Sequence, residues 1–246
     1  MKSVLITGAN KGIGFETATQ FLQKGYFVYM GSRDLKNGHE AAEKLNSLGF
    51  TNLEVVQLDV THEKSVKSAR ETIGKKTDVL DILINNAGIN GGKSPYTVLE
   101  ATSGEYLDAF KTNVIGTANV TQAFLDLLQK SPQPRIVNVS TSVGSLALQS
   151  NTEWPAYTFA KYGVYAASKA ALNMYTIHLA HELRDTNFKV NAVCPGLTKT
   201  DFTFFNGGEA EVAAKRIIKY ALIDQHGPTG KFFSEETNPE TGEIPW

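Results

Sequence analysis

Residues 4–14 of the chain read VLITGANKGIG, and the glycines stand at positions 8, 12 and 14. Val4, Leu5 and Ile6 form a short apolar run typical of a buried strand, and a helical pattern begins near Ile13. Between a strand and a helix, Gly8 suits a tight turn, Gly12 lets the backbone approach a pyrophosphate, and Gly14 lets the helix pack closely on the sheet. The free N–H groups at the helix start favour phosphate. An ordinary strand–helix turn is the simpler alternative.

The same alternation of strand and helix patterns continues along the chain. Strands are expected at 4–6, 27–30, 53–58, 79–84, 136–139, 189–193 and 232–233. Helices are expected at 13–24, 35–48, 63–73, 105–128, 163–183 and 211–222. Strand–helix alternation builds right-handed βαβ units. We therefore expect an α/β fold, a Rossmann-type doubly wound parallel sheet of about seven strands with helices on both faces, in a single domain over residues 1–246.

Composition narrows the class of protein. The 246 residues are 41% hydrophobic and 20% charged, with a formal net charge of −1, which implies no general attraction to nucleic acid or to anionic membrane. Cys194 is the only cysteine, so no internal disulfide can form. The first apolar run is too short for a signal peptide, and no stretch approaches the ~18 apolar residues of a membrane helix. A cytoplasmic location is expected.

Five segments, in chain order, resemble the short-chain dehydrogenase/reductase family. Residues 7–14 resemble its cofactor loop, and residues 85–88 (NNAG) its segment after the fourth strand. Residues 111–114 (KTNV) resemble its catalytic-asparagine helix, residues 165–169 (YAASK) its Y-x-x-x-K motif, and residues 195–200 (PGLTKT) its P-G segment. Within the family, residues 7–15 and 243–246 (EIPW) resemble NADPH-dependent carbonyl reductases, including the sniffer type and plant terpenoid reductases.

The resemblance implies NADP(H) as cofactor and a small carbonyl compound as substrate. The cofactor-binding candidates are Gly8, Asn10, Lys11, Gly12, Ile13, Gly14, Arg33, Asp59, Val60, Asn86, Ala87, Gly88, Tyr165, Lys169, Pro195, Gly196, Leu197, Thr198 and Thr200. Asp59, after the third predicted strand, stands where the family holds the adenine.

The end of the second predicted strand favours NADP over NAD. An NAD site places a carboxylate there for the ribose 2′-hydroxyl, whereas an NADP site places a cation for the 2′-phosphate. Gly31 and Ser32 occupy the carboxylate positions, and Arg33 follows with a planar fork that suits phosphate. Lys11 adds a second cation. The alternative is that both are solvated surface charges, and Asp34 is expected to cap the next helix.

Tyr165 and Lys169 are the candidate proton donor and its partner. Positions i and i+4 share one face of a helix, so both side chains can project together. A nearby cation is expected to lower the pKa of the tyrosine from about 10. In the reducing direction Tyr165 gives its proton to the carbonyl oxygen while hydride reaches the carbon. The resemblance further implies that Lys169 holds the nicotinamide ribose and that Asn113 anchors a water in the proton relay.

A second Y-x-x-x-K motif occurs at Tyr157 and Lys161. Two observations favour Tyr165: residues 170–173 (AALN) continue the family pattern, and Tyr165 lies 30 positions before Pro195, the separation expected for the family. Tyr157 is interpreted as a packed aromatic on the wall of the substrate cleft.

The catalytic hydroxyl is less well defined by the sequence. Residues 138–144 (NVSTSVG) match the length of the family's N-V-S-S-V-A-G segment, so Thr141 takes the place of the catalytic serine. Threonine can donate the same hydrogen bond, but its β-branch restricts the rotamer. Ser142 is the second candidate and Ser140 the third.

Three hypotheses for function remain open. The first is reduction of a ketone, aldehyde or quinone, the second a 3-oxoacyl carrier-protein reductase, and the third a non-catalytic NADP-binding sensor or scaffold. No metal site is expected, because His178 and His181 lack a third ligand.

Thr141 and Tyr165 are 24 positions apart, about 11 more than the family pattern. This insertion is expected to cover the faces of the helices at 105–128 and 163–183, favouring a monomer; a lid over the substrate is the alternative.

Overall fold

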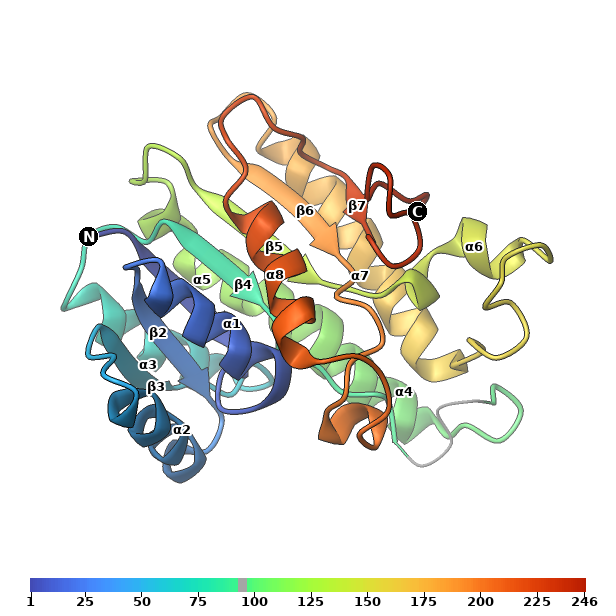
Figure 1. Cartoon of the computed structure of the whole chain (residues 1–246), viewed down its shortest axis with the longest axis horizontal. Helices are drawn as coiled ribbons and strands as arrows, with labels where there is room; N and C mark the ends of the chain where they lie inside the picture. Colours follow the sequence, from blue (N-terminus) through green and yellow to red (C-terminus); the bar gives the residue numbers. More distant parts are fainter. Residues whose placement is uncertain (93–96) are drawn as a thin grey trace.

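The computed structural model describes residues 1–92 and 97–246 and contains one parallel sheet in the order β3-β2-β1-β4-β5-β6-β7 (Figure 1). The strands are β1 (Ser3–Thr7), β2 (Phe27–Ser32), β3 (Leu53–Gln57), β4 (Ile82–Asn85), β5 (Arg135–Val139), β6 (Lys189–Val193) and β7 (Phe232–Phe233). The order confirms the expected doubly wound topology. Because β1 pairs with both β2 and β4, the chain changes direction across the sheet at β1, where such folds bind ligands.

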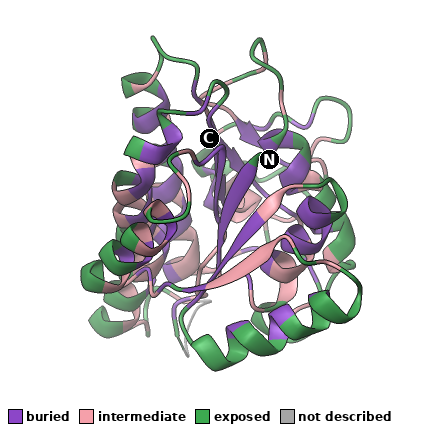
Figure 2. Ribbon diagram, turned by 90° about the vertical axis from the view of Figure 1, so that its left-hand side faces the viewer, coloured by how far each residue is buried: buried purple, intermediate pink, exposed green. Residues whose placement is uncertain are grey.

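Two layers of helices cover the sheet, as Figure 2 shows edge-on. One face carries α1 (Gly12–Gln23), α2 (Leu35–Ser47) and α8 (Ala210–Ala221), and the other carries α3 (Glu63–Gly74), α5 (Thr117–Leu128) and α7 (Gly163–Glu182). Successive strand residues point to opposite faces: Val4 and Ile6 enter the first core, and Leu5 the second. Both faces are buried, which explains why the strands are apolar throughout instead of alternating.

The helix predicted at 105–128 is confirmed as one continuous helical segment, but its middle is π-helical. The segment is α4 (Ser103–Phe110), a π-helical stretch η1 (Lys111–Gly116) and then α5. Gly116 lies so close to the third-strand loop that a Cβ there would be 2.7 Å from the Cγ2 of Val60. A π-helical turn inserts an extra residue into the helical repeat, and such turns often mark functional sites. Here it carries the candidate residue Asn113.

Other boundaries differ by a few residues, and short helices were missed. The strand expected at 79–84 begins at Ile82. Just before it, the N–H groups of Leu80 and Asp81 donate to the carbonyls of Leu127 in α5 and Ser3 in β1. Three short helices lie between the predicted elements: η2 (Ser142–Gly144), α6 (Leu146–Ser150) and η3 (Asp201–Thr203). Over residues 1–92 and 97–246, no helix has the length and apolar character needed to cross a membrane.

Candidate active site

The glycine loop joins β1 to α1 in the conformation that its residues favour. Gly8 and Gly12 have positive φ angles of 66° and 55°, a region that glycine enters without strain. A Cβ on Gly14 would lie 2.3 Å from the carbonyl oxygen of Gly8, so only glycine fits at this helix–loop contact. The helix begins at Gly12, with Lys11 before it and Ile13 packed on the core. Its first N–H groups, which have no partner within the helix, are oriented toward the carboxyl edge of the sheet.

The segment after β4 is bonded directly to the end of β1. The Thr7 hydroxyl oxygen accepts hydrogen bonds of 2.9 Å from the N–H groups of Asn86 and Ala87. In return, the Asn86 side chain donates to the carbonyls of Thr7 and Gly8 at 2.9 and 3.2 Å. The glycine loop and residues 85–88 therefore form one rigid unit at the point where β1 and β4 separate.

Asn113 links this unit to α7. Its fully buried side chain accepts from the N–H of Ile89 at 2.8 Å and donates to the Ile89 carbonyl and to the Ser168 hydroxyl, each at 2.9 Å. Ser168 in turn donates to the carbonyl of Tyr165. A Cβ on Gly88 would lie 3.2 Å from the Asn113 side-chain oxygen and 3.6 Å from the Lys169 Nζ, so this glycine leaves the space between them open. Ser168 was not singled out from the sequence, although it lies inside the quoted motif.

Tyr165 and Lys169 project together from α7, as their spacing predicts. The Lys169 Nζ donates to the carbonyl of Val139 at 2.7 Å and lies 5.8 Å from the centre of the Tyr165 ring. Burial, which disfavours the ammonium form, lowers the pKa of Lys169 to about 8. Lys169 is therefore still mainly protonated at neutral pH and supplies a positive charge beside the tyrosine.

The expected lowering of the tyrosine pKa is wrong for the protein chain alone. Burial, with a smaller contribution from Cys194, raises the pKa of Tyr165 above its ordinary value. Sequence spacing indicates that the cation is near but not how far both groups are removed from water. The hydroxyl therefore holds its proton at neutral pH, which is the state that a proton donor needs.

The three candidate hydroxyls follow β5 and differ in their surroundings. Ser140 is buried and donates to the Asn173 side chain at 2.6 Å, a contact that joins β5 to α7. Thr141 caps η2 by accepting from the N–H of Val143 at 3.3 Å. The Ser142 hydroxyl oxygen lies 3.9 Å from the Cys194 sulfur. Thr141 and Ser142 are half-buried, so they are better placed to meet a substrate than Ser140.

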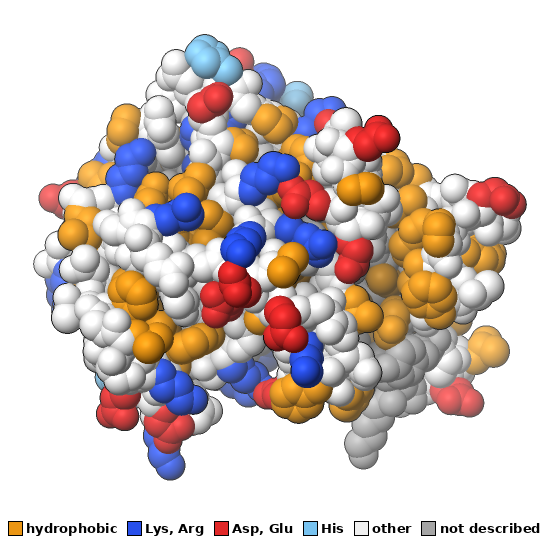
Figure 3. Space-filling model, in the orientation of Figure 1, with side chains coloured by type: hydrophobic (Ala, Val, Ile, Leu, Met, Phe, Trp, Pro, Cys, Tyr) orange, Lys and Arg blue, Asp and Glu red, His pale blue; other side chains and the backbone are white. Residues whose placement is uncertain are grey.

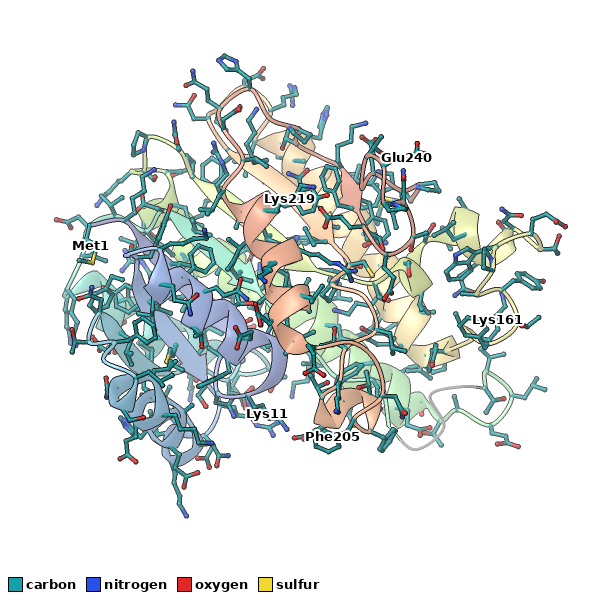
Figure 4. The ribbon with its side chains drawn as sticks, viewed as in Figure 1. Met1, Lys11, Lys161, Phe205, Lys219 and Glu240 are labelled. Carbon is teal, nitrogen blue, oxygen red and sulfur yellow. The ribbon has the colours of Figure 1, made fainter. Side chains whose placement is uncertain are left out.

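Two candidate cations, Arg33 and Lys11, lie exposed at the carboxyl edge of the sheet. Arg33 directly follows β2 and is exposed, whereas the Asp34 carboxylate accepts from the N–H of Asn37 and caps α2, as expected. Lys11 is also exposed, and its ammonium pairs with Asp201 at 2.6 Å. Figure 4 shows Lys11 on the same side of the molecule as Phe205, which follows Asp201 in the chain. An anion at Lys11 would thus compete with the Asp201 carboxylate.

Asp59 and Val60 follow β3. The Asp59 carboxylate accepts from the N–H and the hydroxyl of Thr61, at 2.9 and 2.7 Å, and Val60 is buried against Gly116. Asp59 therefore shapes its own loop, and its side chain is 20% exposed to solvent.

The P-G segment leaves β6 and folds over the glycine loop. Pro195 is buried and its carbonyl accepts from Arg216, Gly196 has a φ of 89°, and Thr198 is buried. Thr200 lies over the loop, where a Cβ on Gly12 would be 3.1 Å from its methyl group. Leu197 is exposed. The other residue of the cofactor set, Asn10, is half-buried in the glycine loop.

Phe202, which sequence analysis did not single out, extends this segment to Tyr165. Its ring centre lies 5.3 Å from that of Tyr165, with the planes tilted by 60°. Phe204 and Phe205 follow with positive φ angles of 52° and 60°, a region in which a bulky residue is strained. Phe202 therefore places an aromatic ring beside the candidate proton donor.

Together these residues fit an extended dinucleotide. Adjacent strands present, in order, an exposed arginine after β2, a helix start with a glycine loop after β1 and an open glycine after β4. Opposite β5 lie the buried Lys169 and the half-buried Tyr165. In Figure 3, Lys and Arg side chains are interspersed with Asp and Glu on the visible face. The described residues contain no cluster of three His, Cys, Asp or Glu side chains able to hold a metal ion.

Comparison with known proteins agrees with this geometry. The model of the short chain dehydrogenase family matches residues 2–207. The chain belongs to the short-chain dehydrogenase/reductase family. Membership makes it an oxidoreductase and accounts for the sheet order described above.

Two enzymes with plant sources are similar over nearly the whole chain. The (−)-isopiperitenone reductase of Mentha piperita is 34% identical, covering 94% of this chain and 96% of its own. The solved structure of salutaridine reductase from Papaver somniferum is 32% identical with a TM-score of 0.82, covering 95% of this chain and all of that one. The NADPH-bound carbonyl reductase from chicken fatty liver has a TM-score of 0.85 at 28% identity. The match covers 100% of this chain and 99% of that chain.

The glycine loop makes a prediction about stability. In a helix, Gly→Ala favours folding by up to ~1 kcal/mol through propensity alone. Gly14→Ala should instead destabilise the dehydrogenase by about 1–3 kcal/mol, because the new methyl group meets the Gly8 carbonyl. Gly104→Ala in α4, where a Cβ meets nothing closer than 3.8 Å, is the matched control and should stabilise. Urea unfolding of both variants measures the difference; equal shifts would contradict the contact at Gly14.

Proposed function

We propose that this dehydrogenase is an NADPH-dependent carbonyl reductase that reduces a ketone, aldehyde or quinone to the alcohol. The observation that carries the proposal is the placement of Tyr165 and Lys169 on one face of α7, at the carboxyl edge of the sheet and beside the hydroxyls that follow β5. A non-catalytic NADP-binding protein would have no need to keep a buried lysine next to a protonated tyrosine. The names of the relatives, which describe reductases, support the same class of reaction.

NADPH, when bound, supplies the hydride. The glycine loop and the first N–H groups of α1 would hold its pyrophosphate, and Arg33 and Lys11 its 2′-phosphate. Lys169, buried beside Gly88, would meet the nicotinamide ribose. The cofactor in the chicken carbonyl reductase structure, NADPH, supports this preference, as does Asp34, whose carboxylate is occupied by the helix cap.

The proton for the new hydroxyl group comes from Tyr165. As hydride reaches the carbonyl carbon, the Tyr165 O–H bond breaks and the proton passes to the carbonyl oxygen, leaving a phenolate. The Lys169 ammonium stabilises this negative charge across the shared helix face, and the interaction is stronger because Lys169 is buried and Tyr165 is half-buried. The hydroxyl of Thr141 or Ser142 would donate to the same carbonyl oxygen and orient it.

The substrate side of the site is apolar. Leu197, Phe202, Phe204 and Phe205 are exposed on the segment after β6, and the ring of Phe202 lies beside that of Tyr165. We propose that the carbonyl compound brings an apolar body to this segment. We also propose that the protein is cytoplasmic, with residues 1–246 forming one NADP-binding domain.

The first test concerns the proton donor. Tyr165→Phe should lower kcat by about 10²–10⁴-fold, the usual contribution of a general acid, with NADPH binding retained because only the hydroxyl is removed. Tyr157→Phe should keep most of the activity. The activity of both variants is measured as NADPH oxidation with ketones, aldehydes, quinones and acyl thioesters. The opposite ranking of the two variants would show that the wrong motif has been assigned.

The second test concerns the cofactor. Arg33→Ala should weaken NADPH binding by about 1–3 kcal/mol through loss of charge-assisted hydrogen bonds, with NADH binding nearly unchanged. Lys36→Ala, which removes an exposed cation from the next helix, is the matched control. Fluorescence titration gives both dissociation constants. An equal loss for NADPH and NADH would place Arg33 away from the 2′-phosphate.

The third test concerns assembly, for which we propose a monomer. The insertion leaves Ile115 and Met174 each 53% exposed, so it does not cover this part of the two helices as expected. These side chains stand among exposed polar residues such as Lys111, Gln122 and His178, however, and isolated apolar side chains do not make an interface. Light scattering should give a mass near 26.8 kDa. A stable species of several times that mass would refute the monomer.

A further inference from the structure

The second tyrosine–lysine pair has no role in the chemistry proposed above, yet it is firmly held. Tyr157 and Lys161 lie in the turns between α6 and α7, not on a helix. The Lys161 Nζ sits 3.8 Å from the centre of the Tyr157 ring, within range of a cation–π interaction. Figure 4 shows Lys161 on the α6 side of the molecule. The lysine points to one residue of α6, Gln149.

Gln149 uses both ends of its side-chain amide. Its oxygen accepts from the Lys161 Nζ at 2.9 Å, and its backbone carbonyl accepts from the same ammonium, also at 2.9 Å. Its nitrogen donates to the carbonyls of Val143 at 3.1 Å and Ala160 at 2.7 Å. The charge on Lys161 determines which way the amide faces, because the oxygen must meet the cation and the N–H groups must then meet the two carbonyls.

Val143 belongs to η2, the turn that contains Ser142 and is capped by Thr141. The opposite side of this turn is held by α7: the Asn173 side chain donates to the Gly144 carbonyl at 3.1 Å, and Gly144 packs against Lys169. Gln149 contacts this turn from α6. The turn that carries both candidate hydroxyls is therefore held between the catalytic helix on one side and Gln149 on the other.

We propose that Gln149, oriented by Lys161 and Tyr157, is a positioning residue for the hydroxyl that orients the substrate carbonyl. The proposal rests on the carbonyl reductase function. Residues inserted between the hydroxyl and the tyrosine thus act on catalysis through η2, besides any contact with the substrate. In this proposal Lys161 contributes its positive charge and Tyr157 its aromatic ring, and the Tyr157 hydroxyl takes no part.

A small displacement of a hydroxyl acts on turnover more than on binding. A misplacement of about 1 Å can reduce a rate by ~100-fold. Gln149→Met removes the donors and the acceptor at similar volume, and Gln149→Glu keeps an acceptor for Lys161 but places an oxygen against two carbonyls. Both should lower kcat by about 10–100-fold, with the dissociation constant for NADPH unchanged. Lys161→Arg should retain most of the activity that Lys161→Met loses, because arginine keeps the cation over the ring.

The experiment uses the full chain, NADPH and a carbonyl compound that the wild type reduces, with Tm recorded for every variant. Gln225→Met, the same change at an exposed position after α8, is the matched control and should leave kcat unaltered. Wild-type turnover in a folded Gln149→Met variant would overturn the proposal. The proposal would also be overturned if, in both Gln149 variants, kcat fell only in parallel with NADPH binding or with Tm. Gln149 would then have a purely structural role. A wild type without activity on any carbonyl compound would instead refute the proposed function itself.

Discussion

The crowded contact between Gly14, Gly8 and Asn86 governs the geometry of the whole carboxyl edge. The first turn of α1 comes so close to the preceding loop that no side chain fits at position 14. The Asn86 amide closes the other side by bonding to the carbonyls of Thr7 and Gly8. Because β1 pairs with both β2 and β4, this contact determines where the helix start, the arginine after β2 and the asparagine segment after β4 lie relative to one another.

Burial is the second physical factor that the site uses. Asn113 joins the loop after β4 to Ser168 on α7, and Lys169 is anchored on the last carbonyl of β5. These links bury Lys169 and leave Tyr165 half-buried; removal from water raises the pKa of the tyrosine and lowers the pKa of the lysine. In such surroundings a charge that forms on the tyrosine oxygen interacts strongly with the neighbouring ammonium.

Much of the fold could be predicted from periodicity, because apolar runs and helical repeats are local. The strand Phe232–Phe233 and the helix cap at Asp34 were predicted as observed. The π-helical turn at η1 could not be predicted, since the sequence 111–116 continues an acceptable α-helical pattern. The candidate site was predicted as a set of residues, whereas the roles of Ser168, Phe202 and Gln149 come from contacts with residues far along the chain.

By itself, the sequence determined the strand–helix alternation, the glycine loop, the tyrosine–lysine pair four positions apart and hence the family. These features depend on residues within a few positions of one another, so spacing alone encodes them. Only the tertiary structure decided the raised pKa of Tyr165, the pairing of Lys11 with Asp201 and the use of Lys161 as a support for Gln149. The reason is physical: burial and ion pairing depend on which groups the folded chain brings together, and Lys11 meets a residue 190 positions away.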